Sequence, residues 1–299
     1  YFTEEIKLNR RIKGILNGAI ASASYGTNPL FALPLFAAGI GVNSVLFYRY
    51  ALAVIIYGLW LKFKKKMSFH LTKKEFIPLF ILGIFFSLSS LTLYDAFNYI
   101  EAGIACTILF IYPVLVAIIM AMFFNEKITK TVISSILLTS IGIALLYNGK
   151  TGVSLNLYGV GIVFLSALLY ALYIVGVKNI KAIQHINRAK MSFYVMLFGL
   201  IVYIINLKFC TQLQVLDKPY LWLLAIGLSI FPTIISLETI TISIKLVGST
   251  TTAILGALEP LTAIFFGVLV FHEQLTTRIC IGVMLILLGV LLIVTRKKR

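Results

Sequence analysis

Long apolar runs alternate with short charged segments along the whole chain. Runs such as SSILLTSIGIALLY (residues 134–147) and IGVMLILLGVLLIV (residues 281–294) extend with their flanks to roughly the 20 residues that one helical crossing of a bilayer needs. Apolar runs bounded by charges therefore predict ten membrane-spanning helices. These are placed at residues 14–36, 43–62, 76–98, 102–124, 129–148, 157–177, 189–208, 219–243, 248–271 and 276–295.

The composition supports a membrane protein. Of 299 residues, 60% are hydrophobic and 12% are charged, which leaves too little polar surface to coat a soluble domain of this size. We therefore predict an all-α integral membrane protein. The three cysteines and three histidines show neither paired nor metal-ligand spacing, so we expect no disulfide framework, no metal site and no cofactor.

Basic residues gather at the ends of alternate predicted spans. One face carries the clusters KLNRRIK (residues 7–13), KFKKK (62–66) and RKKR (296–299), and few basic residues fall on the other face. The positive-inside rule then predicts that both termini are cytoplasmic. The expected location is a bacterial inner membrane. Insertion and contact with anionic lipid explain the formal net charge of +16, so no nucleic-acid partner is expected.

The two halves of the chain share a pattern at a fixed offset of 147 positions. The matching pairs are Pro113 with Pro260, Phe124 with Phe271, Glu126 with Glu273, Thr129 with Thr276, Leu138 with Leu285, Gly142 with Gly289 and Leu145 with Leu292. We predict two repeats of five spans, residues 1–149 and 150–299. Because five is odd, the second repeat enters the bilayer from the opposite face, and a substrate site is expected near the midplane between the repeats.

The two most alike segments carry a recognisable pattern. AFNYIEAGIACTILFIYPVLVAIIMAMFFNEKIT (residues 96–129) and SIKLVGSTTTAILGALEPLTAIFFGVLVFHEQLT (243–276) resemble the EamA-type family of the drug/metabolite transporter superfamily. The resemblance implies ten helices in a 5+5 inverted-topology repeat around a central cavity, and export of amino acids or other small metabolites. One departure is that Tyr112 stands in the first repeat where Glu259 stands in the second.

Ionisable side chains inside spans are costly and are candidates for function. Glu259 and its counterpart Tyr112 are both predicted near the midplane, and each precedes a proline, Pro260 or Pro113, that removes an amide donor and bends the helix. Glu259 is interpreted as a partner for a proton or a substrate amine. The alternative is a buried, protonated carboxyl group that hydrogen-bonds to a neighbour.

Arg49 and Asp95 are predicted at similar depth, near the outer ends of their spans. We expect them to form an ion pair. A structural pair and side chains that reach the outer headgroups are the plainer interpretations, and a gate at the outer mouth is the more specific one.

Glu238 follows Pro232 in the eighth span, toward the cytoplasmic side. It is interpreted either as a second carboxyl group on the transport route or as a mouth residue close to water. In the following segment GSTTTAILG (residues 248–256), Thr252 is either a hydroxyl that bonds a substrate or a small residue that permits close helix packing.

Aromatic and helix-breaking residues mark two further candidate positions. In the first span, Tyr25, Asn28 and Pro29 interrupt an apolar helix, and the sixth span contains Tyr170. Broken segments at corresponding places in two repeats point to a binding site. Tyr94, next to Asp95, is a weaker member of this group, and any of these aromatics could instead belong to the core or to an interface belt.

These features together favour a secondary carrier, coupled to protons, that exports small metabolites such as amino acids by alternating access. No P-loop and no intramembrane protease motif is present in the sequence, so the chain is not expected to be an enzyme. The alternatives are a carrier of nucleotide-sugar or lipid-linked substrates and a membrane sensor without transport activity. The expected partners are a small-molecule substrate and the lipid bilayer, and the expected state is a monomer or a homodimer.

Overall fold

The computed structural model describes residues 2–96, 98–100, 105, 108–146, 156–271 and 276–295, and in these ranges the regular structure is entirely helical. The helices are α1 (Phe2–Tyr25), α2 (Asn28–Ala37), α3 (Val42–Phe63), α4 (Lys73–Ala96), α6 (Tyr112–Phe124), α7 (Lys130–Leu146), α8 (Leu157–Asn179), α9 (Arg188–Asn206), α10 (Pro219–Ser229), α11 (Ser236–Val247), α12 (Ser249–Leu255), α13 (Leu258–Phe271) and α14 (Thr277–Thr295), with a 3-10 turn η1 (Lys181–Ile183) and a π-helical turn η2 (Ile230–Ile235).

The prediction of an all-α membrane protein is confirmed as regards helical structure and the presence of apolar helices of spanning length. Seven helical segments in the described ranges are long and apolar enough to cross a membrane, and α6 and α7 are shorter apolar helices. The first predicted span, residues 14–36, consists of two helices, α1 and α2, that a turn separates. The count of ten spans stays a prediction, and the boundary proposed between residues 149 and 150 lies outside the described residues.

Helices α7 and α14 occupy equivalent positions in the two repeats and pack against each other with matching contacts. A β-carbon added to Gly142 would lie 2.7 Å from the carbonyl oxygen of Gly282, and one added to Gly289 would lie 2.9 Å from that of Ser135. Ser135 and Gly282 are themselves counterparts at the offset of 147. Since the contacts descend α14 from 289 to 282 as α7 rises from 135 to 142, the equivalent helices are antiparallel, as an inverted repeat requires.

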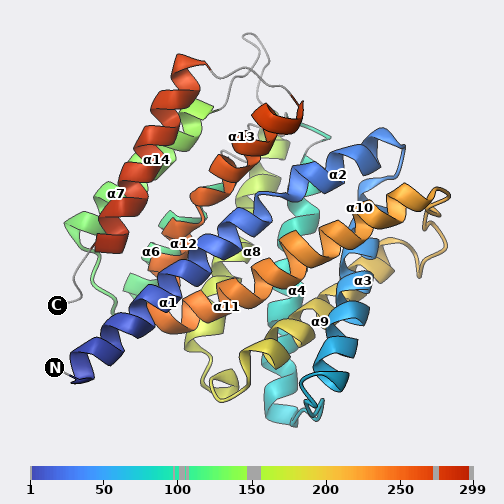
Figure 1. Ribbon diagram of the computed structural model, residues 1–299, viewed down its shortest axis with the longest axis horizontal. Helices are drawn as coiled ribbons and strands as arrows, with labels where there is room; N and C mark the ends of the chain where they lie inside the picture. Colours follow the sequence, from blue (N-terminus) through green and yellow to red (C-terminus); the bar gives the residue numbers. More distant parts are fainter. Residues whose placement is uncertain are drawn as a thin grey trace.

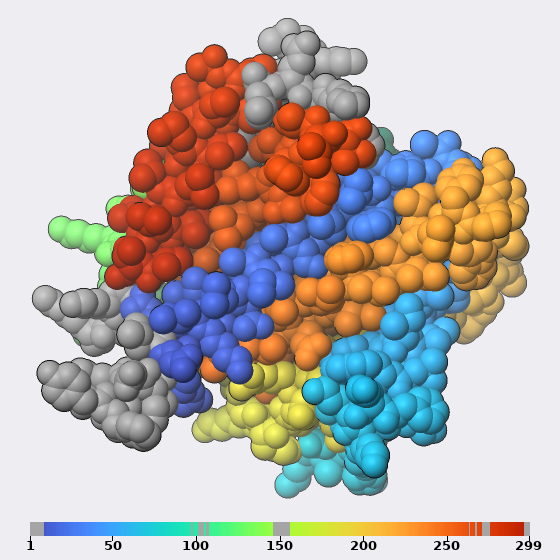
Figure 2. Space-filling view, viewed as in Figure 1, coloured from blue at the N-terminus to red at the C-terminus, as the bar shows by residue number. Residues whose placement is uncertain are grey.

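One face of the bundle brings the first, eighth and ninth predicted spans together (Figure 1). Figure 2 shows α1 and α2, in blue, crossing this face between α12–α13 on one side and α10–α11 on the other. The ends of the chain lie on the same side, because Arg11 Nη2 in α1 donates a hydrogen bond of 2.7 Å to the carbonyl oxygen of Val294 in α14. Helices α4 and α8 lie behind this layer, α3 packs against α10, and α9 packs against α3, α4 and α11.

Candidate functional site

Two interrupted helices lie side by side on the face that Figure 1 shows, and the place where their interruptions touch is called the crossing. The first interruption is the turn at Gly26 and Thr27 between α1 and α2, and the second is the turn at Gly256 and Ala257 between α12 and α13. A β-carbon at Gly26 would lie 2.4 Å from the carbonyl oxygen of Glu259. That distance leaves no room for a side chain. Residue 26 therefore has to be glycine for the turn between α1 and α2 to pack against the start of α13.

Proline explains where the helices restart. Pro29, Pro113 and Pro260 each lie in the first turn of a helix, α2, α6 or α13 respectively. The first amide groups of a helix have no partner inside the helix, so the missing N–H of proline costs little there. The predicted bends are therefore complete interruptions, in which one helix ends and another begins.

Glu259 lies in the first turn of α13, directly after the interruption. Its side chain is half-buried, and its carboxylate accepts no hydrogen bond from the part of the chain that the structure describes. The charged or polar groups within electrostatic reach are the hydroxyls of Tyr25, Tyr112 and Tyr170 and the guanidinium of Arg49. The start of a helix is a favourable place for a negative charge, because the free amide groups point toward it.

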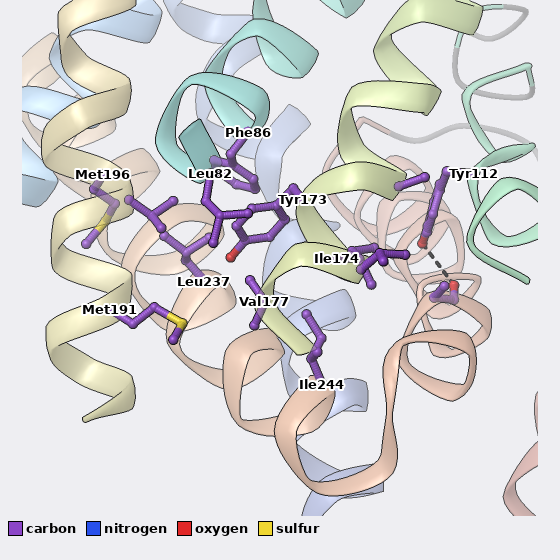
Figure 3. Close-up of a cluster of buried hydrophobic side chains, with 14 of the residues drawn as sticks. Leu82, Phe86, Tyr112, Tyr173, Ile174, Val177, Met191, Met196, Leu237 and Ile244 are labelled. Carbon is purple, nitrogen blue, oxygen red and sulfur yellow. Dashed lines mark hydrogen bonds between the residues drawn. The ribbon is translucent and has the colours of Figure 1, made fainter. Parts of the chain in front are cut away.

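Tyr112 supports the interruption from the other repeat. Its hydroxyl donates a hydrogen bond of 3.0 Å to the carbonyl oxygen of Ala253 (dashed line in Figure 3). In a continuous helix, that carbonyl would accept from the amide of Ala257, which bonds instead to the carbonyl of Ile254 at 3.1 Å. Tyr112 also meets Tyr170 edge to face, with 4.8 Å between ring centroids. The Tyr170 hydroxyl has no hydrogen-bond partner in the described chain.

Arg49 is fully buried, with 0% of its surface exposed. Its Nε donates to Thr233 Oγ1 at 2.7 Å, and its Nη2 donates to the carbonyl oxygen of Pro232 at 2.9 Å. Nη1 has no hydrogen-bond partner among the described residues, and the guanidinium carbon lies 5.3 Å from the centre of the Tyr25 ring. Arg49 thus joins α3 to the π-helical turn η2 and packs on the ring of Tyr25, one of the tyrosines within electrostatic reach of Glu259.

The π-helical turn at Pro232 creates the acceptors that Arg49 uses. Proline removes one helical hydrogen bond, so the carbonyls around it need other donors. Thr233 Oγ1 donates to the Leu228 carbonyl at 2.8 Å, and Ser24 Oγ in α1 donates to the carbonyl of Phe231. Three side chains therefore donate hydrogen bonds to carbonyl groups in and around η2. Two of them, Ser24 and Arg49, come from the first repeat.

The expected ion pair between Arg49 and Asp95 is not formed in the described structure. Asp95 is exposed at the end of α4 and accepts a hydrogen bond of 3.3 Å from Asn98 Nδ2. The prediction is wrong because it considered only charged partners, whereas Arg49 finds uncharged acceptors at η2. Asp95 is exposed, so its carboxylate does not carry the cost of burial that would require a charged partner.

Asn28 and Tyr94 do come together. Asn28 Nδ2, at the start of α2, donates to the Tyr94 hydroxyl at the end of α4 with a length of 2.9 Å. Tyr94 is buried, and the Asn28 Oδ1 atom is buried without a hydrogen-bond partner in the described chain. This contact ties the helix that follows the first interruption to the first repeat, near Tyr25 and Arg49.

Glu238 and Thr252 lie apart from the crossing. Glu238, in the first turn of α11, lines a separate pocket that extends along this helix to Leu246. Its carboxylate faces the buried hydroxyl of Tyr57, which has no hydrogen-bond partner in the described chain. Thr252 is buried between α11 and α12, where its hydroxyl bonds to the carbonyl of Gly248 at 2.8 Å and to Ser243 Oγ at 2.9 Å. Thr252 therefore serves helix packing.

Sequence reasoning missed two buried tyrosines of α3, Tyr50 and Tyr57, which belong to the same core cluster as Tyr173. The hydroxyls of Tyr50, Tyr57 and Tyr173 are buried without a hydrogen-bond partner in the described residues, and Figure 3 shows Tyr173 among apolar side chains. A signal was present in the second span, because Tyr50 and Tyr57 are separated by seven residues and so lie on the same face of one helix. Arg49 precedes Tyr50 in the chain, and its guanidinium carbon lies 5.9 Å from the centre of the Tyr50 ring.

The comparisons with known proteins agree with this architecture. A solved crystal structure superposes with a TM-score of 0.79 at 16% sequence identity, covering 93% of this chain and 95% of its own, which shows a common fold. An uncharacterized transporter of Archaeoglobus fulgidus is 25% identical over 130 residues, covering 42% of this chain and 43% of the relative. Uncharacterized transporter YxxF of Bacillus subtilis is 28% identical over 165 residues, covering 54% and 49%.

The chain thus spans about half the length of the curated relatives that it matches. The family match is wider. The model of the EamA-like transporter family fits residues 12–148 and again residues 157–295, once for each half of the chain. With two copies of the family pattern and two sets of equivalent helices, the chain belongs to the EamA-like transporter family.

Proposed function

We propose that the chain is a secondary transporter that exports small metabolites with an amine group, such as amino acids, by alternating access and in exchange for protons. The observation that carries the proposal is the state of Glu259. It is a carboxylate at an interrupted helix, without a hydrogen-bond partner in the described chain, in reach of three tyrosines.

A carboxylate next to aromatic rings suits an ammonium group. Ring faces attract a cation, and the carboxylate supplies the opposite charge in a setting where little water competes. Tyr25, Tyr112 and Tyr170 come from α1, α6 and α8, so the two repeats both contribute to the environment of Glu259. In proteins with inverted repeats, such a junction is where a transported solute binds.

Proton coupling follows from the same lack of partners. A carboxyl group that is not held by a fixed hydrogen bond can exchange a proton for a cationic solute, so that only one of them is bound at a time. The proton would then enter on one side of the membrane and the solute would leave on that side. In this proposal, both termini lie in the cytoplasm of a bacterial cell, and the transporter works as a monomer or a homodimer.

Transport into liposomes tests this proposal. Purified protein in liposomes should move radiolabelled amino acids against their gradient when a pH gradient is imposed. Glu259→Gln should abolish the response to the pH gradient, since the amide cannot carry a proton. Glu126→Gln is the matched control, because it makes the same change beyond the end of α6, away from the crossing. If transport by Glu259→Gln responds to pH as the wild type does, Glu259 does not couple protons.

A further inference from the structure

A cavity lies along α11, where Lys65 and Arg188 are among the residues that line it. It has a volume of about 580 Å³, within the range of small-molecule sites, and α1, α9, α11 and the segments after α3 and η1 line it. None of Tyr25, Tyr112, Tyr170 and Glu259 is among its lining residues. It is therefore separate from the crossing of the interrupted helices. We call it the basic pocket, after its lining residues Arg10, Lys65, Arg188 and Lys245.

Positive charge in the basic pocket is not balanced. Among the described residues, none of its four basic side chains takes part in an ion pair. Arg188 is half-buried at the start of α9 and makes no side-chain hydrogen bond in the described chain. Lys245 is held in place, because its Nζ donates to the carbonyl oxygen of Ile186 at 3.2 Å. Two cations beside each other in one pocket favour an anionic ligand, and a guanidinium can hold a carboxylate through two hydrogen bonds.

The same pocket also holds a negative group. This group is Glu238. The Tyr57 hydroxyl lies beside its carboxylate, but the two form no hydrogen bond in the described chain. Apolar side chains, Ile242 and Leu246, lie on the same helix as Glu238 and complete the lining. The basic pocket thus offers cationic, anionic and apolar surfaces together, which matches a small zwitterion with an apolar side chain.

We propose that the basic pocket captures the transported solute from the cytoplasm as a zwitterion. Arg188 and Lys245 bind its acidic group, Glu238 binds its amine, and Ile242 and Leu246 contact its side chain. This inference rests on the proposed export function and on the cytoplasmic orientation of the basic face. It adds a site that the solute occupies before it reaches Glu259, and it defines the substrate class as amino acids of moderate size.

Binding of three related probes tests the assignment of each group. Leucine carries both charges, leucinamide lacks the acidic group, and 4-methylpentanoate lacks the amine. In nanodiscs of phosphatidylcholine, leucine should bind the full chain most tightly, and each of the other probes should bind about tenfold more weakly or worse. Arg188→Gln should weaken leucine and 4-methylpentanoate but not leucinamide. Glu238→Gln should weaken leucine and leucinamide but not 4-methylpentanoate.

Two controls separate this pocket from other sites. Lys74→Gln removes an exposed basic residue outside the pocket and should leave all three affinities unchanged. Glu259→Gln should retain the Arg188-dependent binding of leucine, even if its transport is lost. The two proposals can therefore fail independently, because one is measured by binding and the other by the response of transport to pH.

Three results would overturn the proposal. The first is no binding of leucine to the wild-type chain, and the second is a loss on Arg188→Gln that is the same for all probes, as general damage would give. The third is loss of leucine binding when phosphatidylglycerol replaces phosphatidylcholine, which would assign the pocket to an acidic lipid headgroup.

Discussion

The fourth and ninth predicted spans occupy equivalent places in the two repeats, but their key side chains do different things. Tyr112 is buried, and its hydroxyl is bonded to the carbonyl of Ala253 in the other repeat. Its counterpart Glu259 is half-buried, and its carboxylate has no hydrogen-bond partner in the described chain. The first repeat thus supplies a hydrogen bond to the interrupted helix, and the second carries a carboxylate that accepts no hydrogen bond from the described residues.

The difference extends to Gly256, the first residue of the turn between α12 and α13. Gly256 has Leu109 as its counterpart at the offset of 147. A β-carbon at Gly256 would lie 1.7 Å from the Tyr112 hydroxyl oxygen, so the second repeat needs glycine where the first repeat tolerates leucine. By contrast, α7 and α14 remain nearly interchangeable in their contacts. Divergence between the repeats is therefore concentrated at the crossing of the interrupted helices.

The largest effect is expected when the two side chains are exchanged. In the double variant Tyr112→Glu with Glu259→Tyr, a carboxylate would face the Ala253 carbonyl, which also only accepts hydrogen bonds. We expect transport in liposomes to fall to background and the free energy of unfolding to fall by about 3 kcal/mol. The matched control exchanges Thr139 and Ile286, which are counterparts in α7 and α14, and should keep transport. Wild-type transport by the first exchange would show that the repeats are equivalent at this position.

A smaller loss is expected for Gly256→Ala. The added methyl group would push Tyr112 away from the interruption and would also lie 2.9 Å from the carbonyl of Ala253. Overpacking of this kind costs about 2 kcal/mol, which thermal unfolding in detergent can measure. Adding Tyr112→Phe should recover part of the loss, because the hydroxyl in the path of the methyl group is gone. If adding Tyr112→Phe lowers the stability of Gly256→Ala further, the Tyr112 hydroxyl is not the reason that residue 256 is glycine.

The symmetric part of the molecule gives a third comparison. Gly142→Ala and Gly289→Ala should each lower the free energy of unfolding by about 1–2 kcal/mol, since each methyl group would press on a carbonyl of the facing helix. The two losses should agree within about 0.5 kcal/mol, the ordinary error of such comparisons. Clearly unequal losses of stability for the two variants would mean that the contacts of α7 and α14 differ between the repeats, as those of Tyr112 and Glu259 do.

The smallest effect is expected for single hydroxyl groups. Tyr112→Phe removes one buried hydrogen bond and should cost about 1 kcal/mol of stability. Tyr170→Phe serves as the control, because its hydroxyl has no hydrogen-bond partner in the described chain and its ring contacts would remain. Equal losses for the two variants would argue against a supporting role of the Tyr112 hydroxyl.

The sequence by itself determined the membrane class, the repeat and the place of Glu259 beside an interruption. Each follows from local information: apolar run length, residues that recur at one offset, and a proline whose missing N–H disturbs its own helix. Pro29, Pro113 and Pro260 accordingly lie at helix starts. A proline can bend a helix or end it, and the sequence does not show which of the two occurs. The bends expected at these prolines are complete interruptions in the structure.

Tertiary structure alone decided which partners the side chains found. Arg49 was expected to pair with Asp95, but a buried guanidinium takes whatever acceptors lie nearest, and the π-helical turn at Pro232 supplies carbonyls that no sequence pattern announces. The nesting of Gly26 against Glu259 and the basic pocket around Arg188 also bring together residues far apart in the chain. Such contacts depend on how helices pack in three dimensions, and the periodicity of any one helix carries no record of its neighbours.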